Sequence, residues 1–170
     1  MTLSQSEQPR LFAELPGERL NDNDTTLTPL SLLGRLGIFD LDPCAFPGHR
    51  TARHLICWPD DGLQKDWNGR VWLNPPYSEP APWLDRLMKH GDGIALVLAS
   101  TDTKWFHDYA AKATGLLFIR GRPTFLREDF TEVGLMRASV LVAFGADNAS
   151  RLSLSGIAGW FVGQASMARN

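Results

Sequence analysis

The sequence has little cysteine and no long apolar run, and both shortages narrow the class of protein. Cys44 and Cys57 are the only cysteines in 170 residues, which indicates a reducing compartment and not a disulfide-based scaffold. The apolar runs are far shorter than the roughly 20 residues of a membrane-spanning helix, and the N-terminus lacks a signal-peptide pattern. No histidine or cysteine cluster has zinc-site spacing. We therefore expect a cytoplasmic protein without a metal ion or a membrane partner.

The net charge is small, but the charges are unevenly distributed. A formal net charge of −2 disfavours a protein that coats nucleic acid. Residues 1–30 carry five acids and two arginines. Residues 104–127 carry one acid and five cations, which are Lys104, Lys112, Arg120, Arg122 and Arg127. A local cluster of cations is what nucleic-acid binding requires. The alternative is a solvated helix face followed by ordinary loop arginines.

The length suits one domain with a core of its own. Residues 1–26 are polar and acidic and are predicted to be partly disordered, while residues 27–170 are predicted to form a single domain. The sequence contains neither internal repeats nor low-complexity blocks.

Apolar periodicity predicts strands that alternate with helices. The predicted strands cover residues 38–42, 54–58, 71–73, 94–98, 116–119 and 139–144, and the last is expected to run antiparallel to 116–119. The predicted helices cover 30–36, with Thr28 as N-cap and Pro29 as first helical residue, 82–90, and 103–113, with Asp102 as N-cap. Residues 120–137 are expected to form a long loop, and the tail at 157–167 has no clear assignment. This alternation is typical of a mostly parallel, doubly wound α/β sheet.

The stretch from Val71 to Tyr77 joins the end of a buried strand to a stiff polar loop. The two prolines after Asn74 cannot donate ladder hydrogen bonds and keep the residues before them extended, so the strand stops there. Open α/β sheets bind ligands at the carboxyl ends of their strands. An amide side chain, backbone carbonyls and the Tyr77 ring together suit an exocyclic amino group on a flat ring. The alternative is a proline-rich turn.

Two acids on the first predicted strand provide a second candidate site. With the two-residue period of a strand, Asp40 and Asp42 are expected on the same side, where two buried carboxylates need cations or hydrogen-bond donors. Pro43, Cys44 and Ala45 follow in place of the usual glycine-rich turn. Cys44 is interpreted as a small packing residue and not as a nucleophile.

Asn74-Pro75-Pro76-Tyr77 after an apolar strand resembles motif IV of the amino-methyltransferases that use S-adenosylmethionine. The wider pattern resembles the small phage-type DNA adenine-N6 methyltransferases, a Dam-like family, over about residues 25–145. The other matching segments are Thr28-Pro29, Phe39 to Ala45, Asp60 to Leu63, Trp67, Gly69 to Val71, Pro82-Trp83, Trp105 to His107 and Gly121-Arg122. The resemblance implies a Rossmann-like class I methyltransferase domain, to which the predicted antiparallel strand at 139–144 belongs. Full-size relatives carry a separate target-recognition domain, and we expect none here because 170 residues leave no room for one.

The resemblance also implies roles for individual residues. The catalytic residues would be Asn74, Pro75, Pro76 and Tyr77. The Asn74 side chain and the Pro75 carbonyl would accept the hydrogens of an adenine amino group, and Tyr77 would stack on a base flipped out of the duplex. S-adenosylmethionine would be bound by Thr28, Pro29, Asp40, Asp42, Pro43, Cys44, Ala45, Asp60 and Asp61. An Asp-Gly turn is the alternative explanation for Asp61.

The expected activity is site-specific methyl transfer to N6 of adenine in DNA. The implied partner is double-stranded DNA, with no obligate protein partner, and the contacts to DNA would be made by Lys104, Arg120, Arg122 and Arg127. Two alternatives stay open. One is a methyltransferase for a protein glutamine or an RNA amino group, because related enzymes share Asn-Pro-Pro-Tyr. The other is a non-catalytic binding module. The resemblance implies the cytoplasm of a bacterial host and a phage or prophage gene, and it indicates neither the recognition sequence nor a paired restriction enzyme.

Overall fold

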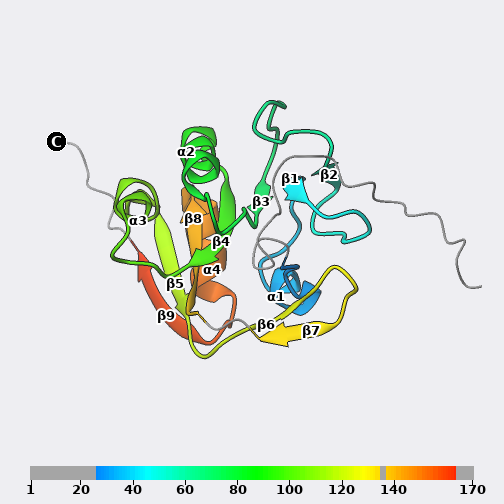
Figure 1. Cartoon of the computed structure of the whole chain (residues 1–170). Coiled ribbons are helices and arrows are strands. Elements are labelled where there is room, and N and C mark those ends of the chain that lie inside the picture. The colour runs from blue at the N-terminus through cyan, green and yellow to red at the C-terminus, as the bar shows by residue number, and fades with distance from the viewer. Residues whose placement is uncertain (1–25, 135–136, 164–170) are drawn as a thin grey trace, which may run out of the picture.

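The structure, a computed structural model, describes residues 26–134 and 137–163. Its centre is a seven-stranded sheet in the order β2-β1-β3-β4-β8-β5-β9 (Figure 1). The strands are β1 Leu41–Ala45, β2 His54–Cys57, β3 Val71–Leu73, β4 Gly93–Leu98, β5 Gly115–Ile119, β8 Ser139–Phe144 and β9 Gly159–Gly163. The segment predicted to be partly disordered, residues 1–26, lies outside the described residues except for Thr26.

The sheet is mostly parallel. β1 pairs in parallel with β2 and β3, and β3 pairs in parallel with β4. β8 lies antiparallel between β4 and β5, so β5 has the direction of β4. The predicted late antiparallel strand is therefore confirmed as β8. A second reversed strand, β9, pairs with β5 and accounts for part of the unassigned tail.

Helices cover both faces of the sheet, as two-residue alternation in its strands requires. On one face, Val71 and Leu73 of β3 pack in a cluster with α2, Ala81–His90, and with α3, Lys104–Asp108. On the other face, Trp72 of β3 packs in a cluster with α1, Leu30–Gly34, and α4, Ala146–Leu154. Figure 1 shows this layered arrangement. Buried strands with apolar side chains on both sides explain the near-continuous apolar runs of β4 and β8.

The sheet has its topological switch point between β1 and β3. The chain leaves β1 toward β2 on one side and then returns past β1 to β3 on the other. Ligands of open α/β sheets bind in the crevice at such a point, outside the carboxyl ends of the strands. Pro43 to Ala45 are the last residues of β1 and not the turn that the sequence predicted, and Asn74 follows β3 directly, so both candidate segments stand at the carboxyl ends of strands beside the switch point.

A two-stranded hairpin follows β5 where the sequence predicted a long loop. β6, Thr124–Leu126, pairs with β7, Glu132–Gly134, and Phe125 in the middle of β6 is fully buried. Leu27 forms an isolated antiparallel bridge with Leu126. The N···O distance is 2.7 Å where Leu27 donates and 2.9 Å where Leu126 donates. The prediction of a loop was wrong because strands of three residues are too short to show a period in sequence.

Three further predictions are corrected. The first strand begins at Leu41, later than predicted, because Phe39 turns into the core and packs on Trp72 with ring centroids 5.4 Å apart. Thr28 does not cap α1: Pro29 is the N-cap, and the Thr28 hydroxyl is buried without a hydrogen bond. Thr103, not Asp102, precedes α3, which stops at Tyr109, where φ is −125° and ψ is −60°. A 3-10 turn, η1 at Ala110–Lys112, continues the chain.

Candidate active site

The Asn74 side chain is held in one orientation by a neighbouring backbone. Its Nδ2 donates to the Thr26 carbonyl at 2.7 Å. Its Oδ1 is buried and has no hydrogen-bond partner. A buried acceptor without a partner costs roughly 1–3 kcal/mol, so it marks a place where a donor from a ligand would bind. The loop therefore holds the Asn74 carbonyl oxygen buried and unpartnered at the carboxyl end of β3.

Tyr77 closes the other end of this loop. Its ring is half-buried and packs against the α1-side core cluster. Burial raises the pKa of Tyr77 to about 12, and the neighbouring Thr26 side chain offsets a smaller part of that shift. The Tyr77 side chain is therefore a neutral phenol at physiological pH. The carbonyl of Pro76 accepts from the Glu79 N–H at 3.3 Å, so a turn follows the loop immediately.

Asp42 is a buried carboxylate beside the switch point, 2% exposed. The Thr51 hydroxyl donates to one oxygen, and the Cys44 N–H donates to the other at 3.0 Å. Burial raises the pKa of Asp42 to about 6, and the two hydrogen bonds oppose this rise. The site therefore holds an acid that would gain from a cation or from further donors.

The carboxyl-end half of β1 and the loop after β2 touch each other. A Cβ atom on Gly62 would lie 1.8 Å from the Pro43 carbonyl oxygen, so only glycine allows this close approach. Asp61, next to Gly62, accepts from the Leu63 N–H at 2.9 Å and is exposed. Asp60 forms a salt bridge of 2.8 Å with Lys65. The structure thus brings Asp61 beside Pro43, as a shared ligand site requires, whereas Asp60 already has a cation.

Asp40 lies at the amino end of β1, whereas the Asn74 loop lies at the carboxyl end of β3, the neighbouring parallel strand. It precedes β1, and Leu41 is in register with Val71, the first residue of β3. Its carboxylate accepts from Arg53 and from the Arg70 N–H, both at 2.9 Å. The backbone donor at Arg70 and the Arg53 cation hold the pKa of Asp40 below its ordinary value. The expected Asp40–Asp42 pair on one side of a strand was wrong, because Asp40 is not within the strand.

Two residues that the sequence did not single out complete the crevice. His49, in the loop after β1, is 4% exposed, and its Nε2 has no partner. Thr51 donates to Asp42. Burial lowers the pKa of His49, and a hydrogen bond to the Thr28 backbone opposes that shift. The signal for Thr51 was present, since a buried Asp42 needs a donor. His49 gave no such signal.

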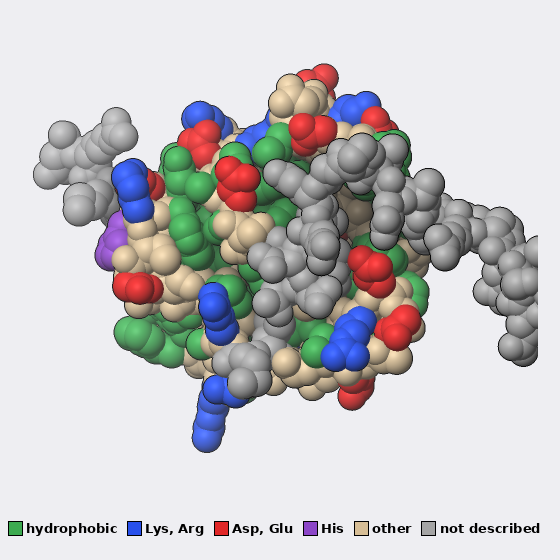
Figure 2. Space-filling view, in the orientation of Figure 1, with side chains coloured by type: hydrophobic (Ala, Val, Ile, Leu, Met, Phe, Trp, Pro, Cys, Tyr) green, Lys and Arg blue, Asp and Glu red, His purple; other side chains and the backbone are tan. Residues whose placement is uncertain are grey.

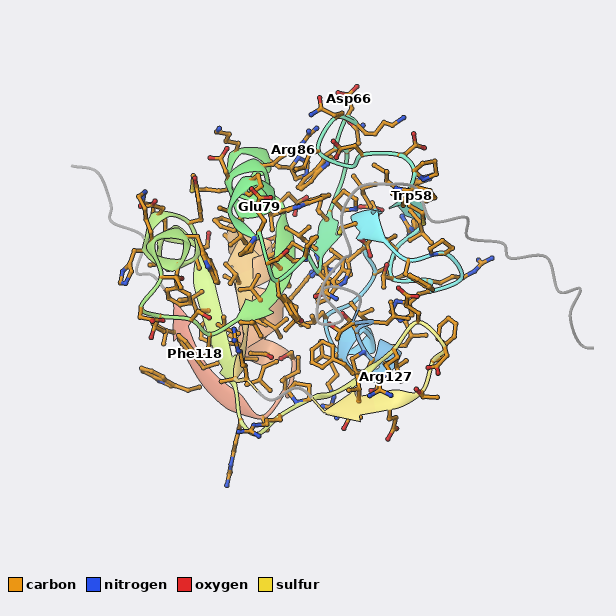
Figure 3. The ribbon with its side chains drawn as sticks, in the orientation of Figure 1. Trp58, Asp66, Glu79, Arg86, Phe118 and Arg127 are labelled. Atoms are coloured by element: carbon orange, nitrogen blue, oxygen red, sulfur yellow. The ribbon has the colours of Figure 1, made fainter. Side chains whose placement is uncertain are left out.

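The predicted DNA-contacting residues fall into two groups. Arg120, Arg122 and Arg127 lie on the segment that leaves β5 and enters the hairpin, all three are exposed, and among the described residues none forms a salt bridge. Figure 3 shows Arg127 on the hairpin beside α1. Figure 2 shows Lys and Arg side chains over this lower part of the molecule, interspersed with acids. Lys104, on α3, is paired with Asp108 one helical turn away.

A shallow depression of about 440 Å³ lies away from this crevice. It is lined by Asp66, Trp67, Asn68, Arg86, Lys89 and His90. Figure 3 places Asp66 and Arg86 at the far end of the molecule from Arg127. Residues 66–68 lead into β3, so this depression lies near the amino end of that strand, whereas Asn74 follows its carboxyl end.

Within residues 26–134 and 137–163, no group of three or more histidine, cysteine or acidic side chains is placed to hold a metal ion. In the same part of the chain, every helix is too short or too polar to cross a membrane. Cys44 and Cys57 do not form a disulfide.

The burial of Asp42 predicts a pH dependence of stability. The folded chain binds this proton more tightly than the unfolded chain, whose carboxyl has the ordinary pKa of 3.8, and the folded value is about 6. In the absence of ligand, the free energy of unfolding should therefore fall by roughly 3 kcal/mol as the pH rises from about 4 to about 6, and then level off. Urea unfolding of the wild type and of Asp42→Asn across this range measures it.

The Asp42→Asn variant should lack this decline and should be more stable than the wild type at pH 7. Asp102→Asn, which changes an exposed loop acid, is the matched control and should keep the wild-type profile. Parallel profiles for Asp42→Asn and wild type would show that Asp42 titrates normally and is not desolvated.

A mostly parallel sheet covered by helices, with a polar loop at its switch point, fits a methyltransferase fold. The match to a family model defines the family: residues 20–155 match DNA N-6-adenine-methyltransferase (Dam). This chain belongs to that family.

Two curated relatives are phage proteins. The chain is 33% identical over 87 residues to a DNA N-6-adenine-methyltransferase of Haemophilus phage HP1 (strain HP1c1), which covers 48% of this chain and 50% of the relative. It is 32% identical over 94 residues to a DNA N-6-adenine-methyltransferase of Escherichia phage T1, which covers 52% of this chain and 40% of the relative. The alignments thus span half or less of each relative. No solved structure matches the chain significantly.

Proposed function

We propose that this protein transfers a methyl group from S-adenosylmethionine to N6 of an adenine in DNA. The observation that carries the proposal is the Asn74 amide, whose Nδ2 is bonded to Thr26 while its Oδ1 is buried and unpartnered at the switch point of the sheet. An exocyclic amino group is a hydrogen-bond donor that such an oxygen accepts. Family membership and the two phage relatives support the same reaction.

The fold supports assignment to the Rossmann-like class I methyltransferases. Helices lie on both faces of the sheet, the switch point lies between β1 and β3, and a reversed strand, β8, separates β4 from β5. A single domain over residues 27–170 would then carry both the methyl-donor site and the catalytic loop. Phage relatives support a bacterial cytoplasm as its place of action.

The crevice fits S-adenosylmethionine as the methyl donor, and when bound this cofactor supplies an electrophilic methyl group. Its two cationic centres and ribose hydroxyls suit the buried Asp42 and the exposed Asp61. The buried hydroxyl of Thr28 has no partner and suits a polar group of the amino-acid end. Pro29, Pro43, Cys44 and Ala45 would form the walls. Asp40 and Asp60 are the weakest members of the proposed set, because each already pairs with a cation.

The catalytic residues would act by position and by electrostatics. The amino group of adenine is a poor nucleophile because its lone pair is delocalised into the ring. Asn74 Oδ1 and the Pro75 carbonyl would each accept a hydrogen bond from one N–H of the amino group. These two bonds would orient the nitrogen and stabilise the more tetrahedral transition state. Pro76 keeps Pro75 extended, and the Tyr77 ring would stack on the base. The reaction requires no covalent protein intermediate.

The target adenine would have to leave the DNA stack, because the crevice is at the end of a sheet and a duplex base is out of its reach. Stacking on Tyr77, worth about 1–3 kcal/mol, would offset much of the few kcal/mol that unstacking costs. Double-stranded DNA would be held by Arg120, Arg122 and Arg127, with Lys104 as an outlying contact. The three arginines lie between β5 and β7, and Leu126 of the same segment bridges to Leu27, whose neighbour Thr26 holds Asn74.

One experiment tests the proposal directly. The full chain is expressed in a bacterial host that lacks adenine methylation, and N6-methyladenine is mapped in the host DNA by long-read sequencing. The purified chain is also incubated with labelled S-adenosylmethionine and, separately, duplex DNA, ribosomal RNA and a release factor. We expect label only in DNA. Label in RNA or in a protein glutamine would replace the proposed substrate, and the absence of S-adenosylmethionine binding would favour a non-catalytic module.

A further inference from the structure

The segment of residues 26–28 lies between the hairpin and the crevice and faces both. Leu27 bonds to Leu126 through both its N–H and its carbonyl. In an extended chain, successive carbonyls point to opposite edges, so the Thr26 and Thr28 carbonyls share the edge away from the hairpin. On that edge Asn74 donates to Thr26, and His49 hydrogen-bonds the Thr28 backbone. Asn74 and His49 are therefore neighbours along one edge of this segment.

The spacing of the two side chains follows from chain geometry. Carbonyls two residues apart in an extended segment are separated by roughly 7 Å. One of them fixes the amide that would receive the adenine amino group, and the other fixes the ring of His49. A methyl donor whose reactive methyl group lies near Asn74 could therefore reach His49 with a chain of roughly 7 Å, which is the length of a short side chain.

The hydrogen bonding of His49 determines what its free nitrogen does. Nε2 has no partner, so the bond to the Thr28 carbonyl is donated by Nδ1. In the neutral ring the other nitrogen then carries a lone pair and acts as an acceptor. Burial favours that neutral ring. The Phe130 ring, with its centroid 6.3 Å from that of His49, covers the site from the hairpin side.

We propose that Nε2 of His49 accepts a hydrogen bond from the α-ammonium group of the methyl donor and so positions its amino-acid end. The inference rests on the proposed function and adds a residue to its ligand site. A carboxylate is disfavoured as the partner, because it would face a lone pair. A purely structural histidine would also be expected to satisfy Nε2 within the protein, since buried polar groups are almost always paired, and the described residues offer it no partner.

The unpartnered hydroxyl of Thr28 strengthens the assignment. Thr28 is 1% exposed, and its Oγ1 is a second buried group without a partner in the residue whose backbone His49 contacts. A hydroxyl donates to a carboxylate as readily as it accepts from an ammonium. An α-amino acid group carries both partners on one carbon, and it would satisfy Thr28 and His49 together.

Two ligands that differ only at this end test the proposal. S-adenosylhomocysteine carries the amino-acid group, and 5′-methylthioadenosine lacks it. Calorimetry measures both ligands on the wild type, His49→Ala and His49→Gln. Loss of an acceptor for a charged donor should weaken S-adenosylhomocysteine binding to His49→Ala roughly tenfold or more, with methylthioadenosine unchanged within about twofold. His49→Gln, which keeps an acceptor near Nε2, should recover most of the affinity.

The ratio of the two affinities separates a contact from a folding effect, because partial unfolding weakens both ligands alike. Equal weakening of both ligands in His49→Ala and His49→Gln would make His49 structural and overturn the inference. Unchanged S-adenosylhomocysteine affinity in both variants would also overturn it, while methyl transfer by the wild type would leave the proposed function intact. A wild type that binds neither ligand would reject the proposed function itself.

Discussion

Replacing Asn74 with alanine is expected to lower the rate of methyl transfer to adenine by about two orders of magnitude or more. The variant removes the oxygen that would accept a hydrogen from the adenine amino group as the nitrogen becomes tetrahedral. It leaves Thr26, Asp42 and the loop at Gly62 in place, so binding of the methyl donor should persist. Single-turnover methylation of duplex DNA and calorimetry with S-adenosylhomocysteine measure the two properties separately.

Asn68→Ala provides the matched control, since this exposed asparagine precedes the amino end of β3, whereas Asn74 follows its carboxyl end. It should keep the wild-type rate. Asn74→Asp should also be inactive, because a carboxylate oxygen would replace Nδ2 opposite the Thr26 carbonyl. Near-normal turnover by a folded Asn74→Ala variant would reduce this loop to a structural turn.

Removal of Arg120, Arg122 and Arg127 together is expected to flatten the dependence of DNA affinity on salt by about three units in the log–log slope. Each is exposed, and among the described residues none is paired with an acid, so each is available for a phosphate. A phosphate contact releases counterions and carries no sequence information. Affinity for all duplex sequences should therefore fall alike. Fluorescence anisotropy at several salt concentrations measures the slope.

Single variants divide this effect into contacts of about one unit each. Lys65→Ala with Lys89→Ala is the matched control, because both cations are paired with acids and lie outside the segment that joins β5 to the hairpin. An unchanged slope in the triple arginine variant, together with a flatter one in the lysine pair, would move the DNA face to the loop after β2 and to α2. An arginine that reads guanine would instead relax specificity at one base position.

The sequence was most informative where an element has a period or an interruption of its own. β3 and the Asn74 loop were predicted correctly because two prolines end a buried strand abruptly. α2 was predicted from its apolar spacing, and Leu84 and Leu87 are its buried residues. The reversal of β8 was also predicted. These features depend on neighbours in the chain, which a sequence displays directly.

The remaining features depend on distant partners. α4 was not predicted because its buried face consists of Ala149, Leu152 and Asn148, whose amide donates to the Phe144 carbonyl and to Asp92. A buried asparagine interrupts the apolar spacing by which a helix is recognised in a sequence. His49 was likewise missed, because its contact is with the backbone of Thr28, which lies 21 positions earlier in the chain. The structural role of Arg70 also depends on distant partners: it is half-buried, bonds Asn148 at 2.6 Å and lies over the Phe39 ring.

The bonds of the Thr26–Thr28 segment are made by its backbone, which separates two kinds of mutation. Exchanging the Thr26 side chain leaves the carbonyl that holds Asn74 and removes only the side-chain interaction with Tyr77. Inserting or deleting one residue before Pro29 would exchange the two edges of the segment and turn the carbonyls toward the hairpin. The number of residues between Leu27 and Pro29 therefore fixes which carbonyls face Asn74, independently of the role proposed for the Thr28 hydroxyl. A library over this segment should keep its residue count constant and keep the buried Leu27 and Thr28.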